Sequence, residues 1–171
     1  MELILVMNED EKRILDDCDL EIKNIKTWID NKNQLDSKVK FLVAYAVIKA
    51  SGSIELVFKS MINTFLSQNC IDETKVFLTK NIIDSSANPS PGIIEKYLEQ
   101  FDGKRKERFS DLLKDSQDKG NLKSLVSLRN DIAHGRTIHS SINDIESYFE
   151  SGKKILEILE KVINDSPDTP E

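Results

Sequence analysis

The sequence predicts an all-α protein, an antiparallel bundle of four or more helices. Its 171 residues include only 6 Gly and 4 Pro, too few for a loop-rich all-β chain. Apolar residues recur at helical spacing over most of the chain, and no segment shows a convincing strand pattern. Charged residues make up 32% and hydrophobic residues 39%, which is typical of a globular domain that buries a core without metals or disulfides.

The first helix is expected to begin after Asn8. Glu11 follows three residues later, so the two side chains fit a capping box. An apolar stripe then continues at helical spacing to about Asp30. The local pattern therefore predicts a helix of about 22 residues with a well-defined start.

A second, long helix is expected to start at Asp36 or Ser37 and to continue through Leu66. It is apolar on most of its circumference, so we expect it to be the central and most buried element. We interpret its aromatic residues, such as Phe41 and Tyr45, as core residues. Gly52 inside it predicts a close approach of another helix or a slight bend.

Later helices are marked by their end signals. Pro91 suits a first turn, Asn121 is a good N-cap, Gly135 suits the position after a helix end, and Ser141 caps the last helix. Residues 85–91 form the clearest loop, and 118–120 are expected to form a turn. The predicted helices are 72–83, 91–101, 104–115, 121–134 and one that starts after 141.

We expect one helical domain over residues 1–164 and a disordered tail over 165–171, because the tail offers no apolar surface to bury. The N-terminal segment lacks a basic region and is a poor signal peptide, and no apolar run looks long enough to cross a bilayer. Two cysteines, Cys18 and Cys70, exclude a disulfide scaffold and are expected to act as small hydrophobic residues. These features predict a cytoplasmic protein without a membrane partner.

Charge is unevenly distributed along the chain. The net charge is −6, which disfavours non-specific nucleic-acid binding over the whole surface. Residues 104–136 nevertheless hold nine Lys and Arg against five Asp and Glu, a net of +4, which leaves −10 for the remainder. Two interpretations remain open, a solvated helix face or a local site for anions. The acidic run at residues 16–21 is interpreted as exposed, and no metal site is expected.

One predicted helix carries a chemically distinctive end. On a wheel advancing about 100° per residue, Arg129 falls in the middle of an apolar face, while Asn130 and His134 lie together on one edge. A guanidinium cannot lose its proton, so this position is costly unless the charge is paired. Alternatively, Arg129 extends to solvent or pairs with a buried carboxylate, and His134 only ends the helix favourably.

Residues 129–135, with the sequence RNDIAHG, resemble the Arg-x4-6-His signature of HEPN domains (higher eukaryotes and prokaryotes nucleotide-binding). Residues 122 to about 162 are most similar to the prokaryotic RiboL-PSP-HEPN-like branch. Many HEPN proteins are metal-independent ribonucleases that work as homodimers without a cofactor. The resemblance implies that RNA is the substrate, that His134 handles a proton and that Arg129 stabilises charge on the phosphate or orients it. Asn130 would orient His134 or the substrate. The product would then carry a 2′,3′-cyclic phosphate.

Physical chemistry agrees with these roles. An imidazole has an ordinary pKa near 6.5, which suits proton transfer at neutral pH, and a guanidinium offers several planar donors to phosphate oxygens. Five residues of helix separate Arg129 from His134, about 7.5 Å along the axis and roughly 140° around it. The Arg129 and His134 side chains of one helix are therefore poorly placed to contact the same phosphate. A C2 homodimer with this helix in its interface is expected.

Further residues are expected to assist. Glu55 is interpreted as a rim residue or as a buried carboxylate that pairs with Arg129 or faces the site, and Asp131 as a second supporting residue. His139 is expected at the surface. The residues expected to bind RNA phosphates are Lys104, Arg105, Lys106 and Arg136.

Two functions follow from the resemblance. The first is an endoribonuclease that acts as a toxin or in antiphage defence. The second is a non-catalytic RNA-binding, nucleotide-binding or dimerisation module of a defence system. In HEPN toxins paired with a nucleotidyltransferase antitoxin, a modified Tyr lies two residues after the motif His. Here Arg136 occupies that position, so that particular antitoxin is in doubt, while another antitoxin or defence partner stays open.

Overall fold

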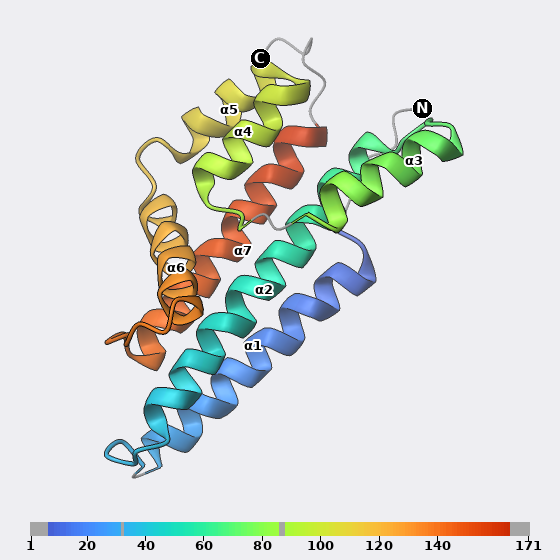
Figure 1. Cartoon of the computed structure of the whole chain (residues 1–171). Helices are drawn as coiled ribbons and strands as arrows, with labels where there is room; N and C mark the ends of the chain where they lie inside the picture. The colour runs from blue at the N-terminus through green and yellow to red at the C-terminus, as the bar shows by residue number, and fades with distance from the viewer. Residues whose placement is uncertain (1–6, 32, 86–87, 165–171) are drawn as a thin grey trace.

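A computed structural model (Figure 1) describes residues 7–31, 33–85 and 88–164, and within these ranges the only regular elements are helices. The predicted fold class is confirmed. A π-helical turn, η1 (Thr79–Ile83), directly continues the third helix. The α-helices are α1 (Glu9–Asp30), α2 (Val39–Leu66), α3 (Asp72–Leu78), α4 (Pro91–Phe101), α5 (Gly103–Leu113), α6 (Gln117–Ala133) and α7 (Ile142–Asn164).

The bundle is built around α2 and α7. Figure 1 shows α1 alongside α2 and α6 alongside α7, while α4 and α5 cover the end of the molecule at which α7 finishes. Phe58 of α2, Phe109 of α5 and Phe149 of α7 are among the largest fully buried side chains. These rings come from distant parts of the sequence, so burying them joins the helices into one core.

Two helix starts follow the sequence closely. The side chain of Asn8 accepts a hydrogen bond from the Glu11 N–H at 2.9 Å, and that of Glu11 accepts from the Asn8 N–H at 2.8 Å. Ser141 and Asp144 form the same reciprocal arrangement at the start of α7. Both predicted caps are confirmed, because a capping box depends only on residues three positions apart.

The start of α6 corrects the sequence analysis. Ser116 caps the helix by accepting a hydrogen bond from the Asp118 N–H at 3.1 Å, so residues 118–120 are helical rather than a turn. Asn121, the predicted cap, lies one turn inside the helix and donates to the Ser151 hydroxyl of α7 at 2.9 Å. Two good caps stand five residues apart, and the contact with α7 favours the longer helix.

The outward face of α2 is a second correction. Phe41 is 65% exposed and Tyr45 is 49% exposed, so neither is a core residue. The neighbouring helices cover the opposite side of α2 and leave this side open. Apart from the adjoining part of α2 itself, no atom of the described residues lies within 4 Å of where a Cβ on Gly52 would be, so no described helix makes the predicted close approach.

By length and composition alone, α2 passes the test for a membrane-spanning helix, contrary to the expectation that no such segment exists. Half of the qualifying window is buried inside the bundle, which is usual for the core helix of a soluble domain. This helix does not by itself indicate a membrane protein. Residues 1–6 and the expected tail, residues 165–171, lie outside the described residues.

Candidate nucleic-acid site

The last turn of α6 ends at a glycine-dependent cap. Gly135 has a φ of +71° and follows His134, which closes the helix. The Gly135 N–H donates to the Ile132 carbonyl at 3.0 Å, and the Arg136 N–H donates to the Asp131 carbonyl at 2.8 Å. These two bonds define a Schellman motif, which satisfies carbonyls that the helix end would leave unpaired. The predicted role of Gly135 is confirmed, and His134 is exposed at the tip of the motif.

Asp131 and Arg136 are joined a second time through their side chains. The Arg136 Nη1 lies 2.9 Å from the Asp131 Oδ1. The Arg136 side chain remains 70% exposed, so part of its guanidinium is still available to solvent and to an incoming anion. Asp131 therefore supports the turn that carries His134 rather than contacting the imidazole itself.

Arg129 lies on α6, one and a half turns before the helix end, and is partly buried. Its guanidinium makes no ion pair or hydrogen bond with any residue of the described ranges. The expected pairing with Glu55 is wrong, because the Glu55 carboxylate lies 2.7 Å from the Lys59 Nζ on the next turn of α2. Lys59 in turn donates to the carbonyls of Ile83 and Ser85, so this pair fixes η1 onto α2.

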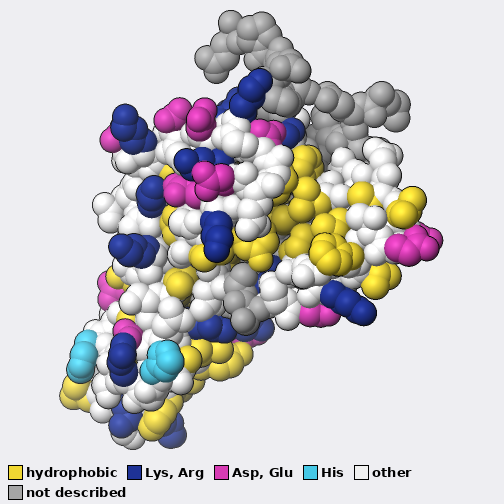
Figure 2. Space-filling view, turned by 45° about the horizontal axis from the view of Figure 1, so that its top comes forward, with side chains coloured by type: hydrophobic (Ala, Val, Ile, Leu, Met, Phe, Trp, Pro, Cys, Tyr) yellow, Lys and Arg dark blue, Asp and Glu magenta, His cyan; other side chains and the backbone are white. Residues whose placement is uncertain are grey.

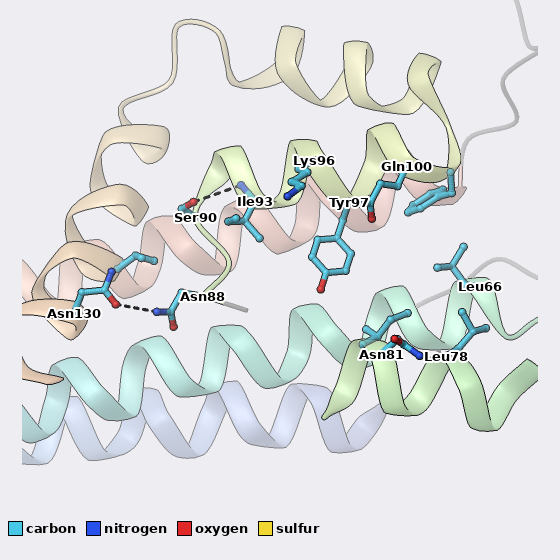
Figure 3. Close-up of a pocket in the computed structure, with 13 residues that line it drawn as sticks. Leu66, Leu78, Asn81, Asn88, Ser90, Ile93, Lys96, Tyr97, Gln100 and Asn130 are labelled. Atoms are coloured by element: carbon cyan, nitrogen blue, oxygen red, sulfur yellow. Dashed lines mark hydrogen bonds between the residues drawn. The ribbon is translucent and has the colours of Figure 1, made fainter. Parts of the chain in front are cut away.

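Asn130 contacts a neighbour that the sequence did not identify. Its side-chain oxygen accepts a hydrogen bond from the Asn88 Nδ2 at 2.9 Å (Figure 3). The Asn130 NH2 group makes no hydrogen bond within the described residues, and the same is true of the His134 ring. The structure therefore directs Asn130 toward Asn88, not toward His134 as the helical wheel suggested.

A groove of about 730 Å³ begins at Asn130 and follows α4. Its walls come from α2, α3, η1, α4 and α6, so no local sequence pattern predicts the groove. The groove-lining residues that sequence reasoning missed include Asn81, Asn88, Lys96, Tyr97 and Gln100 (Figure 3).

Arg105, expected to bind RNA phosphates, is occupied by structural contacts. Its guanidinium pairs with Asp102, its Nε donates to the Val162 carbonyl at 3.2 Å, and it lies 5.1 Å from the centre of the Phe65 ring. These contacts hold α5 against α7 and the end of α2. Arg105 therefore joins these helices, and the engagement of its guanidinium argues against the predicted phosphate contact.

Lys104 and Lys106 lie beside Arg105 on α5, far from the motif in the same protomer. The Asn121–Ser151 hydrogen bond sets the register of α6 on α7, which places Arg129 near the start of α7. Arg105 contacts Val162 near the other end, about 30 Å away at 1.5 Å per residue. Figure 2 shows both histidines, in cyan, together at one end of the molecule. His139 is exposed, as expected.

Acidic residues of α1 are engaged in ion pairs. Glu21 lies 2.7 Å from the Lys49 Nζ, and hydrogen bonds from Lys49 and Tyr45 lower the pKa of this carboxyl. Asp19 pairs with Lys23 and Lys153. The described residues contain no group of three or more His, Cys, Asp or Glu side chains arranged to hold a metal ion.

Cys18 is completely buried, and burial raises the pKa of its thiol to about 11. A thiol in that state is protonated at neutral pH and unreactive as a nucleophile. Cys18 thus packs as a small hydrophobic residue, as expected.

Of the comparisons with known proteins, the one with protein families gives a match. Residues 13–165 match the RiboL-PSP-HEPN family, a span that includes the α6 motif and the groove. Searches of curated proteins and of solved structures gave no match. The family match indicates a nuclease or an RNA-binding module. The match covers nearly the whole chain, including the helix α6 that ends in the exposed His134. This chain therefore belongs to the RiboL-PSP-HEPN family.

Proposed function

We propose that this protein is a metal-independent endoribonuclease that leaves 2′,3′-cyclic phosphate ends and whose site is completed in a homodimer. The observation that carries this proposal is Arg129, a partly buried arginine whose guanidinium has no partner among the described residues, on the same helix end as the exposed His134. Withdrawing a charge from water is costly without a counter-ion, and an RNA phosphate supplies one.

The reaction needs only proton transfer and charge stabilisation. The 2′-oxygen of the ribose bonds to the adjacent phosphorus while its proton passes to the neutral imidazole of His134. The bond from phosphorus to the 5′-oxygen breaks, and an imidazolium returns a proton to that oxygen. Arg129 donates to the phosphate oxygens as negative charge develops on them.

A second protomer provides what one helix cannot. Arg129 and His134 are separated by about 7.5 Å along α6 and diverge around its axis. His134 stands at an exposed helix end, so two copies related by a two-fold axis can meet there. Each then contributes an Arg and a His, and the two imidazoles supply the general base and the general acid.

The biological setting that we infer is a cytoplasmic toxin or an antiphage-defence nuclease, controlled by an antitoxin or another protein of the same system. The second candidate is a non-catalytic module that binds RNA or a nucleotide, or that dimerises. One observation favours it: no hydrogen bond from a described residue orients the His134 ring, whereas general bases are usually held by a partner group.

Cleavage of total RNA and tRNA in EDTA tests the proposal. We expect the wild type to cut RNA, His134→Ala to abolish cutting, and the products to carry cyclic phosphates. His139→Ala is the matched control, because His139 is exposed only five residues away and should leave the rate unchanged. If the folded wild type cuts no RNA but binds it, the non-catalytic module is the correct function.

A mixture of wild-type and His134→Ala chains tests the composite site. Heterodimers formed by exchange keep a single intact His134, so they lack either the general base or the general acid of the shared site. We expect these heterodimers to be nearly inactive. Heterodimers that retain about half of the wild-type activity would show that each chain carries its own site.

A further inference from the structure

The groove beside Asn130 runs between α4 on one side and the end of α2 with η1 on the other (Figure 3). It extends along α4 from Ser90 to Phe101, about 16 Å at 1.5 Å per residue. At one end it reaches α6 at Val126 and Asn130, immediately beside Arg129 of the motif. Its volume of about 730 Å³ falls within the range of roughly 300–1,000 Å³ typical of ligand sites.

The groove has an unusual composition for an acidic protein. The chain has a net charge of −6, yet among the described residues no carboxylate lines this groove. Its polar lining consists of neutral amides and hydroxyls with a single cation: Asn81, Asn88, Ser90, Lys96, Tyr97, Gln100 and Asn130. Amides recognise the edges of bases, and a lysine favours phosphate, so this set suits a nucleotide chain.

Tyr97 provides a fixed aromatic surface inside the groove. Its ring contacts the buried Phe58 ring edge-on, with centroids 5.4 Å apart and planes at 88°. Figure 3 shows its hydroxyl directed into the groove, and that hydroxyl makes no hydrogen bond within the described residues. Unpaired RNA bases stack on such rings, whereas a duplex keeps its bases inside.

The Asn88–Asn130 hydrogen bond connects the groove to the motif. Because Asn88 donates to the Asn130 oxygen at 2.9 Å, the Asn130 amide is held at the groove entrance with its own NH2 group available. Asn130 directly follows Arg129 in α6. An RNA strand whose phosphate is bound by Arg129 is therefore close to the entrance of the groove.

We infer that this groove binds the single-stranded RNA next to the scissile phosphate, with Tyr97 as the stacking surface, Lys96 as a phosphate contact and Gln100 as a base contact. The inference rests on the proposed function, since it takes the phosphate at Arg129 as the starting point of the strand. It adds that the substrate must be unpaired there and that α4 residues decide which bases are preferred.

Binding of an uncleavable RNA tests the groove without requiring catalysis. Fluorescein-labelled 2′-O-methyl dodecamers of each base lack the attacking hydroxyl, so their affinity for the full chain is measured directly by anisotropy. We expect Lys96→Glu with Gln100→Glu to weaken the best-bound oligomer at least tenfold. The control is Lys154→Glu with Gln117→Glu, which makes the same charge change at exposed positions outside the groove and should weaken binding less than threefold.

Photo-crosslinking provides a second reading. An oligomer that contains 5-iodouracil should crosslink to the peptide that includes Tyr97, and Tyr97→Leu should remove that crosslink. Equal weakening by the two double variants, no binding by the wild type, or crosslinks confined to other helices would overturn the inference.

The two proposals fail in different ways. If the groove variant still cuts RNA at the wild-type positions and rates, the groove inference is wrong and the nuclease stands. If the wild type binds single-stranded RNA through the groove but cuts none, the nuclease is wrong and the groove stands.

Discussion

The guanidinium of Arg136 lies 2.9 Å from the carboxylate of Asp131, and the backbone N–H of Arg136 donates to the backbone carbonyl of Asp131 at 2.8 Å. In a Schellman motif these two positions often carry a hydrophobic contact. Here an ion pair replaces that hydrophobic contact and closes the turn that carries His134. The pair therefore stabilises the turn and also sets how much positive charge Arg136 offers beside the site.

Substitutions of this pair should separate stability from RNA affinity. Asp131→Asn removes the carboxylate that neutralises Arg136, so we expect RNA to bind more tightly. Arg136→Ala should weaken binding and reduce the slope of log affinity against log salt by about one. Both changes should alter the free energy of unfolding by less than about 1 kcal/mol, because the pair is exposed. Salt titrations of RNA binding provide the measurement, and identical slopes for Arg136→Ala and the wild type would contradict the expected phosphate contact.

Gly135 should be required for the end of α6. Its φ of +71° is strained for any L side chain, so Gly135→Ala should lower the free energy of unfolding by about 1–2 kcal/mol. Gly120→Ala in the same helix is the control. It has ordinary helical geometry with only a 3.5 Å contact to Gln117, so it should raise stability by about 1 kcal/mol. Urea denaturation measures both, and the opposite signs distinguish backbone strain from loss of glycine as such.

Arg105 should matter for stability and not for cleavage. Arg105→Ala loses the bonds to Asp102 and Val162, so we expect a loss of roughly 2 kcal/mol and a Tm roughly 4–8 °C lower. Lys106→Ala, one residue along α5, should change the Tm by less than about 2 °C. Cleavage rates of folded Arg105→Ala should match those of the wild type. A wild-type Tm combined with slower cleavage would restore Arg105 as a phosphate ligand.

Asp102 should make the protein less stable in acid. Burial opposes its ionisation, but hydrogen bonds from the Arg105 backbone and guanidinium outweigh that effect and hold the pKa of its carboxyl below the ordinary value. A lowered pKa in the folded state stabilises the fold above the unfolded value of about 3.9, and this contribution disappears as the pH falls through the folded pKa. Asp102→Asn keeps a capping side chain without the titratable charge. Between about pH 5 and pH 2, the free energy of unfolding should therefore fall less steeply with decreasing pH in the variant than in the wild type.

The helix ends show how far local sequence carries. The sequence predicts the caps at Asn8 (with Glu11), at Ser141 and at Gly135 from residues within a few positions of one another, because caps are local interactions. The start of α6 was placed wrongly since its register depends on Asn121 reaching Ser151, 30 residues away. Neighbouring helices likewise decided that Phe41 is exposed.

The sequence by itself determined the all-α class, most helix bounds and the placement of Arg129, Asn130 and His134 on one helix end, because helical periodicity and capping are encoded over short distances. Only the tertiary structure decided that Glu55 pairs with Lys59, that Arg105 holds α5 to α7, and that Asn130 meets Asn88. It also formed the groove around Tyr97 from five separate elements. Such contacts join residues far apart in the chain, and their partners are selected by the packing of whole helices rather than by any local pattern.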